Sequence, residues 1–356
     1  MNPDSALPSQ PLPPSESHSS TEPPPQTFSF RKVFVGKEGL RAGWGVLIFI
    51  ALFAAFMLIA TVINRKLHVG QQRPTSVSVI SLSFGYVQES LLAAAALLST
   101  WIMSKIERRG RTYGFGNKSW LPLFLVGLLS GLMLLSLLVF ALWKTGFLVV
   151  EGRVIFGADI FRYGLLWLFA FFLVGIAEES LTRGYLLYTL TRGIAWLYEY
   201  LFKTCHSIAL GFWTAAVILS AVFFIGHTSN PGESPVGLLS VFFAGMFFCL
   251  SVWRTGSLWW AIGMHAAWDW GQSFLFGVAD SGLMVQHHVL ATHPEGRPWL
   301  SGGTTGPEGS VFIFAVLAVG CLIVLTLPKG HYISAAAGIA NPQAFQLDLN
   351  QKESES

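Results

Sequence analysis

The segment "VGIAEESLTRGYLLYTL", residues 174–190, carries Glu178, Glu179 and Arg183 inside an otherwise apolar stretch. A charge at the centre of a bilayer costs roughly 2.5–3.5 kcal/mol on insertion scales, so chains tend to keep one only where it has a function. The rest of the chain is also strongly apolar. Of its 356 residues 53% are hydrophobic and 12% are charged, against about 25% charged in soluble domains. We therefore expect a polytopic membrane protein with these charges in its interior.

Apolar runs as long as a membrane-spanning helix, roughly 20 residues, recur along the chain. They predict an all-α polytopic membrane protein with about eight transmembrane helices enclosing a polar cavity within the membrane. The spans are expected near residues 43–63, 76–104, 121–143, 163–189, 207–227, 235–253, 257–279 and 310–328. Such a chain has the lipid bilayer as its main partner, and we expect no nucleic acid to bind it.

Polar tails are expected on both sides of this membrane domain. Residues 1–42 read as a disordered Pro- and Ser-rich tail with a basic juxtamembrane segment, residues 43–328 as the transmembrane domain and residues 329–356 as a polar C-terminal tail. With the N-terminus inside, most lysines and arginines fall on the cytoplasmic side, above all those between the second and third spans. We expect a multi-pass protein of the plasma (inner) membrane with both termini cytoplasmic.

Helical spacing divides the charges of the opening segment into two groups. Glu179 and Arg183 are four residues apart, so they lie on one face and can form an ion pair. Glu178 is rotated away by about one third of a turn, and Thr182 rather than a cation stands four residues beyond it. This pattern predicts one carboxylate held by Arg183 and a second free to exchange a proton as a general base. The alternative is a buried polar clasp between helices with no catalytic function.

Two further segments bring histidines to membrane depth. His227 ends the apolar run of "AVFFIGHTSNPGES", where glycine and proline allow the backbone to break, and we expect this loop to dip back into the protein. In "GSLWWAIGMHAAWDWGQS", His265 and Asp269 are four residues apart on one helical face. That spacing suits a metal site, or a base with the residue that orients it. The alternatives are an interfacial histidine and an interfacial polar pair.

Together these segments supply the groups that peptide hydrolysis needs. Two histidines and a carboxylate suit either a hydrolytic metal site or a metal-free site that activates water. If a metal is bound, we expect zinc on Glu178, His227 and His265. The three cysteines show no C-x-x-C spacing, which argues against a disulfide framework or a thiolate zinc site.

In chain order the motifs E-E-x-x-x-R, F-x-x-x-H and H-x-x-x-(N/D) resemble those of the CPBP family of intramembrane proteases. That family includes the CAAX prenyl endopeptidases and the bacteriocin-processing and self-immunity proteins. The motifs here read Glu178-Glu179-Ser-Leu-Thr-Arg183, Phe223-Phe-Ile-Gly-His227 and His265-Ala-Ala-Trp-Asp269. Order and spacing match across roughly residues 165–275, on three consecutive polar segments.

The resemblance implies an intramembrane protease, with peptide-bond hydrolysis inside or at the edge of the bilayer and a membrane-associated peptide or protein as substrate. It implies that Glu178 and His227 activate a water molecule. His265 and the residue at position 269 would stabilise the oxyanion or complete a metal site. Glu179 and Arg183 would brace these groups, in agreement with their helical spacing.

One residue departs from the pattern of the prenyl endopeptidases, which carry asparagine at the last motif position. Asp269 stands there in this chain, and an ionised carboxylate repels an oxyanion. Asp269 is therefore expected to be protonated, to orient His265 or to bind a cation. This departure argues against simply transferring the prenyl substrate and the metal-free chemistry of those enzymes to this chain. It does not affect the expected fold.

Two other function classes compete with the protease. A non-catalytic immunity or chaperone-like membrane protein would use the polar cluster to bind hydrophobic peptides. A small transporter would use Glu89, Glu178 and Glu179 as a proton relay, although the chain shows no internal repeat of the kind typical of transporters. For Glu89 itself a hydrogen bond to Arg183 or to a loop, a place on the cavity wall, and simple helix packing all remain open.

Overall fold

The computed structural model describes residues 34–36, 39–66, 78–107, 113–117 and 119–330, and the protein is mostly helical, as predicted. The predicted tails 1–42 and 329–356 lie largely outside the described residues. The α-helices are α2 (Ala42–Lys66), α3 (Leu82–Glu107), α4 (Trp120–Lys144), α5 (Ala158–Glu179), α6 (Leu187–Phe202), α7 (Ser207–His227), α8 (Pro235–Thr255), α9 (Trp259–Asp269), α10 (Pro298–Ser301) and α11 (Phe312–Thr326). Two π-helical segments, η1 (Ser180–Leu186) and η2 (Trp270–Leu275), and one 3₁₀ turn, η3 (Pro307–Gly309), complete the helical elements.

Six of the described helices are long and apolar enough to cross a membrane: α2, α3, α4, the kinked helical segment α5–η1–α6, α7 and α8. The span expected at 163–189 extends further at both ends, because α5, η1 and α6 follow one another over 45 residues, from Ala158 to Phe202, with a kink at Gly184. The spans expected at 257–279 and 310–328 are the shorter helices α9, continued by η2, and α11. The predicted number of eight spans is therefore approximate.

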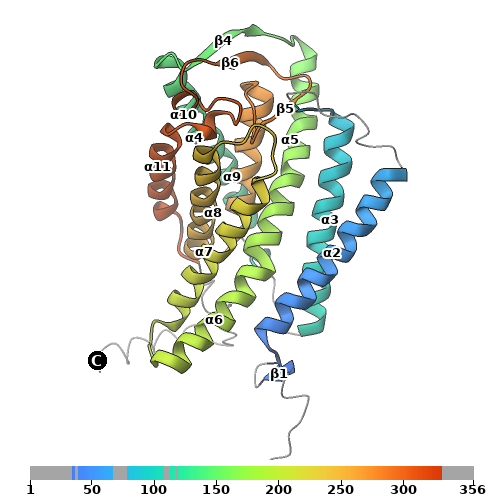
Figure 1. Ribbon diagram of the computed structural model, residues 1–356, viewed down its shortest axis with the longest axis vertical. Helices are drawn as coiled ribbons and strands as arrows, with labels where there is room; N and C mark the ends of the chain where they lie inside the picture. The colour runs from blue at the N-terminus through green and yellow to red at the C-terminus, as the bar shows by residue number, and fades with distance from the viewer. Residues whose placement is uncertain (1–33, 37–38, 67–77, 108–112, 118, 331–356) are drawn as a thin grey trace, which may run out of the picture.

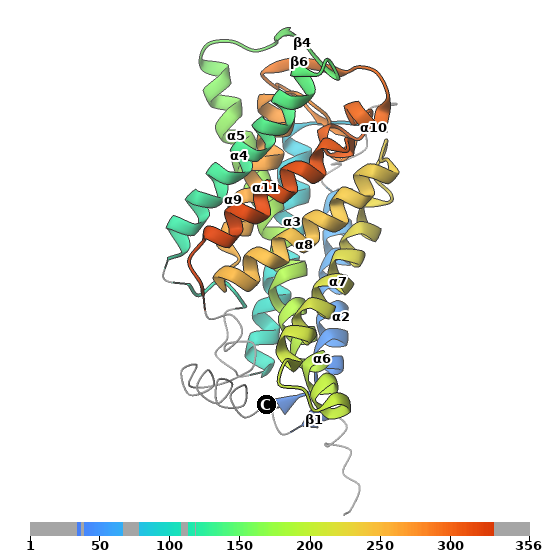
Figure 2. The ribbon, with the colours of Figure 1, turned by 90° about the vertical axis from the view of Figure 1, so that its left-hand side faces the viewer.

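Helix α9 lies in the middle of the bundle, between α4, α5 and α8 (Figure 1). Residues Trp260 to Asp269 are all buried, so α9 meets protein on every side and does not need the length of a lipid-facing span. Helix α2, in contrast, lies at one edge of the bundle, beside α3 (Figure 1). Seen from the side, α8 and α11 cross one face of the bundle obliquely (Figure 2). The residues of α9 are thus the most enclosed in the fold.

Glycines allow the backbones of α4 and α9 to touch. A Cβ atom on Gly127 would lie 2.3 Å from the Trp260 carbonyl oxygen, and one on Gly131 would lie 2.3 Å from that of Met264. On the opposite helix, Gly263 approaches the Phe124 carbonyl in the same way. Membrane helices associate through such small-residue contacts, because lipid provides no hydrophobic driving force between them.

Short strands pair the loops at the ends of the bundle, although the sequence predicted none. Strand β4 (Leu148–Arg153) runs antiparallel to β6 (Leu290–Pro294), and the pair crosses one end of the bundle (Figure 1). Strand β3 (Ser78–Ile80) pairs in parallel with β5 (Leu283–Val285), and β1 (Val35–Gly36) with β2 (Gly39–Leu40). Pairing satisfies backbone groups of these connections that would otherwise lack partners.

The close contact between α4 and α9 leaves no room for a methyl group on Gly131. In Gly131→Ala the new methyl group meets the Met264 backbone, which cannot move aside as a side chain can, so the helices must separate. We expect a loss of roughly 1–3 kcal/mol of stability, measured as a lower thermal unfolding temperature in detergent.

Gly43→Ala is the matched control, since Gly43 lies in α2 and a Cβ added there would meet nothing within 4 Å. Alanine is a better helix former than glycine, so helix propensity cannot account for a loss of stability in Gly131→Ala. Equal unfolding temperatures in the two variants would contradict the role given to this contact.

Candidate active site

The two glutamates occupy the last two positions of α5, where the helix passes into the π-helical segment η1. Within η1, Gly184 has φ −81° and ψ −115°, which is not a helical conformation. Single-turn π segments of this kind are frequent at functional sites, because they change the direction in which the following side chains point. The break lies directly after Arg183, the last residue of the sequence motif.

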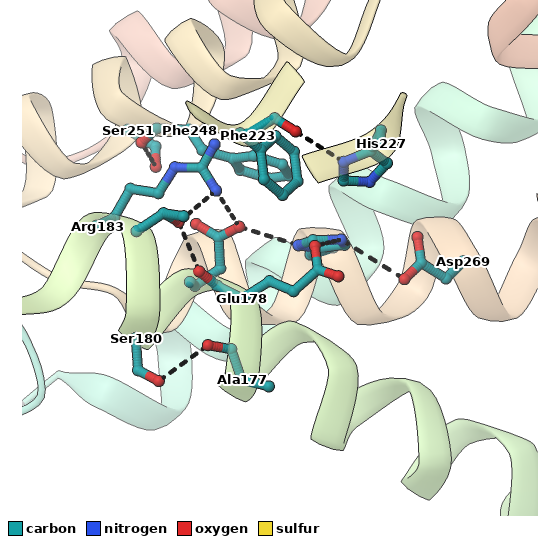
Figure 3. A network of polar contacts seen from close by, with 12 residues as sticks. Ala177, Glu178, Ser180, Arg183, Phe223, His227, Phe248, Ser251 and Asp269 are labelled. Atoms are coloured by element: carbon teal, nitrogen blue, oxygen red, sulfur yellow. Dashed lines mark hydrogen bonds and ion pairs between the residues drawn. The ribbon is translucent and has the colours of Figure 1, made fainter. Parts of the chain in front are cut away.

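Glu179 holds the centre of the site together. Its Oε1 accepts a hydrogen bond from Arg183 Nη1 at 3.0 Å and lies 2.9 Å from His265 Nδ1 (Figure 3). Glu179 and Arg183 are almost completely buried, with 0% and 1% of their surface exposed. The guanidinium of Arg183 also lies over the rings of Phe223 and Phe248, at 4.6 and 5.3 Å. The ion pair expected from the spacing is present, and it contacts a histidine on another helix.

His265 stands between carboxylates on both of its ring nitrogens. Its Nε2 lies 3.7 Å from Glu178 Oε2 and 3.6 Å from Asp269 Oδ2, whereas Nδ1 faces Glu179. Distances above 3.5 Å are too long for direct hydrogen bonds and are typical of groups bridged by water. The side chain of Glu178 is 26% exposed while that of Glu179 is completely buried. Glu178 is thus the carboxylate that faces open space.

His227 reaches the same site from the end of α7. Its Nδ1 lies 2.9 Å from the Phe223 carbonyl oxygen, one turn earlier. A carbonyl only accepts hydrogen bonds, so Nδ1 carries the proton, and in the neutral ring Nε2 is an acceptor. His227 lines the same cavity as His265 and Asp269.

The sequence led us to expect that the loop after His227 dips back into the protein, but it does not. Thr228, Ser229, Pro231 and Gly232 are exposed in a turn between α7 and α8. The expectation was wrong because α5 and η1 are followed by α6, which packs along α7. The end of α7 therefore reaches the level of the glutamates without any help from the loop.

The site opens into one cavity of about 610 Å³. Glu178, His227, His265 and Asp269 all line it, and most of its wall is apolar. Three acids outside the motifs share the wall: Glu89, Asp280 and Glu308. Among the possibilities left open for Glu89, the structure places it on the cavity wall, while Arg183 pairs with Glu179.

Sequence reasoning missed Asp280, which directly follows the span predicted at 257–279, and Glu308, which lies just before the span predicted at 310–328. Glu308 Oε1 accepts hydrogen bonds from the backbone amide and the hydroxyl of Ser281, and Asp280 Oδ2 accepts one from Ser273. Burial and the nearby charge of Asp280 raise the pKa of Glu308 to about 8. Burial and the charge of Asp269 raise the pKa of Asp280 well above its ordinary value. Their only sequence signal was an acid isolated in an apolar, glycine-rich context.

The residues expected to bind zinc do not form a metal site as they stand. A zinc ion needs three or four donors at 2.0–2.3 Å around one point. In the described part of the chain, no group of three or more His, Cys, Asp or Glu residues is arranged to hold a metal ion. Glu178, His227 and His265 line one cavity but not one coordination shell. Zinc on these residues stays an expectation from the sequence, and the donor arrangement does not by itself support it.

Comparison with known families supports the resemblance seen in the motifs. The family described as Type II CAAX prenyl endopeptidase Rce1-like matches residues 161–271, which is less than a third of the chain and contains all three motifs. The predicted resemblance to the CPBP family is confirmed over these residues. Neither a curated protein nor a solved structure matches the chain.

The raised pKa of Glu308 predicts that stability falls as the pH rises. In the folded protein Glu308 keeps its proton up to about pH 8, whereas in the unfolded chain it loses the proton near 4.5. The folded state therefore binds more protons between these values, so its stabilisation is complete below the lower value and is lost toward the upper one. In Glu308→Gln we expect a smaller decrease of the unfolding temperature between about pH 5 and pH 8.

Unfolding temperatures in detergent across a pH series measure this decrease. Glu151→Gln is the control, because Glu151 is exposed on β4 and pairs only with the exposed His293 among the described contacts. A decrease as steep in Glu308→Gln as in the unmodified protein would contradict the prediction.

Proposed function

We propose that the protein is an intramembrane endopeptidase that hydrolyses a peptide bond in a membrane-associated peptide or protein. The observation that carries the proposal is the 3.7 Å separation of Glu178 Oε2 and His265 Nε2 on the wall of one cavity. The match to the CAAX-type protease family supports the same class of enzyme. Helices of membrane-spanning length support its place as an integral multi-pass protein.

Glu178 is the general base of this proposal. It takes a proton from a water molecule beside it, and the water oxygen forms a bond to the scissile carbonyl carbon. His227 Nε2, an acceptor in the neutral ring, holds the second proton of the water in a hydrogen bond. When the tetrahedral intermediate collapses, the C–N bond breaks and Glu178 passes its proton to the leaving nitrogen, which regenerates the carboxylate.

His265 stabilises the oxyanion by donating a hydrogen bond from Nε2. Glu179 orients the ring through Nδ1, and Arg183 holds Glu179 in place. Asp269 Oδ2 lies 3.6 Å from Nε2, where an ionised carboxylate would repel the oxyanion. Of the roles considered for this residue, the protonated form is the one compatible with Nε2 as the donor. The site then works with aspartate where prenyl endopeptidases carry asparagine, because the oxyanion donor is the imidazole.

The apolar cavity wall supports a substrate with apolar character at the scissile region. A prenylated peptide and a transmembrane peptide both meet this description, and a comparison of cleavage with and without a prenyl group separates them. We further propose the plasma (inner) membrane with both tails cytoplasmic. Two contacts support tails on the same side of the membrane. Gly330, after α11, contacts Arg254 at the end of α8, and the adjacent Trp253 packs against Phe212 near the start of α7. The start of α7 lies toward the end of the bundle where α2 begins.

Substitution of the proposed base and oxyanion donor tests the function directly. In Glu178→Gln and His265→Ala we expect cleavage of a membrane peptide to fall by about 10²–10⁴-fold, since each removes a group that acts on the transition state. The purified full chain in detergent or liposomes is incubated with the peptide, and products are identified by mass spectrometry. Glu151→Gln, on the exposed strand β4, serves as the control and is expected to keep full activity.

Unchanged turnover in both variants would exclude the proposed mechanism. If the unmodified protein binds the peptide without cleaving it, and Glu178→Gln binds it equally well, the non-catalytic immunity or chaperone-like function replaces the protease.

Removal of metal is a separate test. The donor arrangement leads us to expect that protein stripped with a chelator, and shown by elemental analysis to be free of zinc, keeps its cleavage rate. Loss of activity on stripping, with recovery on addition of zinc, would instead establish the zinc site expected from the sequence.

A further inference from the structure

Tyr185 lies immediately after the break in η1 and is completely buried. Its ring stacks on Phe49 of α2, with ring centres 4.9 Å apart, and meets Tyr113 edge to face at 5.2 Å. Gly45 of α2 leaves the space for the hydroxyl, because a Cβ there would lie 2.6 Å from it. The side chain is thus enclosed by elements that take no direct part in the proposed chemistry.

The hydroxyl of Tyr185 donates a hydrogen bond of 3.0 Å to Glu107 Oε1, at the end of α3. The same carboxylate oxygen lies 3.6 Å from Arg192 Nη2 of α6, and Arg192 also donates to the Leu40 carbonyl. Glu107 therefore links α3 to the part of the helix that follows the break, through Tyr185 in η1 and Arg192 in α6.

A π-helical segment is held by its surroundings, because the α-helical alternative of the same sequence is intrinsically favoured. A change of register in η1 turns the side chains on either side of Gly184 relative to each other. Arg183 directly precedes Gly184, and Tyr185 directly follows it. Fixing Tyr185 therefore also fixes the direction of the guanidinium that holds Glu179.

We propose that Tyr185 is a positioning residue, whose hydrogen bond to Glu107 keeps η1 in the register that places Arg183 on Glu179 and so orients His265. The chain of contacts is continuous: Glu107 to Tyr185, the backbone of η1 to Arg183, Arg183 to Glu179 at 3.0 Å and Glu179 to His265 at 2.9 Å. The expected effect on kcat rests on the proposed function, whereas the expected effect on the orientation of His265 rests only on the contacts described above.

Tyr185→Phe removes the hydroxyl and keeps the ring that stacks on Phe49. Selective ¹⁵N labelling of the nine histidines gives an imidazole spectrum of the full chain in nanodiscs, in which His265→Gln identifies the His265 signals. We expect Tyr185→Phe to shift the His265 signals and to lower kcat by about tenfold, with KM changed by less than about twofold.

Tyr198→Phe is the matched control, since it removes a tyrosine hydroxyl that joins α6 to α7 after the break, at 3.2 Å from Thr214. It is expected to leave the His265 signals and kcat unchanged. Unshifted His265 signals in Tyr185→Phe, or equal shifts in both variants, would overturn the inference. Shifted signals in a protein that shows no cleavage at all would reject the protease and leave the positioning role of Tyr185 intact.

Discussion

The organisation of the site depends on one buried carboxylate, that of Glu179. It contacts Arg183 on its own helical segment and His265 on α9, and none of the three side chains has more than slight contact with solvent. Removing one partner from a buried charged group leaves an uncompensated charge, which costs far more than the pair contributes. The long helix α5–η1–α6 and the central helix α9 are thereby tied together at the point where the proposed chemistry occurs.

The position of α9 follows from packing rather than from its length. Glycines on α4 and α9 bring the two backbones into contact, and protein rather than lipid surrounds the helix. A helix enclosed in this way can carry His265 and Asp269 without exposing them to hydrocarbon. The π-helical segment η1 supplies the second condition, since it carries Arg183, which holds Glu179.

The cavity combines an apolar wall with acids that have few counter-charges. No lysine or arginine lines it among the described residues, while Glu89, Glu178, Asp269, Asp280 and Glu308 all do. Burial raises the pKa of both Asp280 and Glu308, which favours their neutral forms. The space near Glu178 can thus stay polar enough for water without gathering a large negative charge.

Hydropathy and i, i+4 spacing are local properties, so the amino-acid sequence was enough to establish the helical membrane fold, the three motifs and the pairing of Glu179 with Arg183. The same spacing separated Glu178, which faces the cavity, from Glu179, which does not. The three-dimensional arrangement was needed to show that His265 meets Glu179, that Asp280 and Glu308 join the cavity, and that the turn after His227 is exposed. These contacts join residues far apart in the chain, and their geometry depends on how glycine contacts and the break in η1 set the helices against one another.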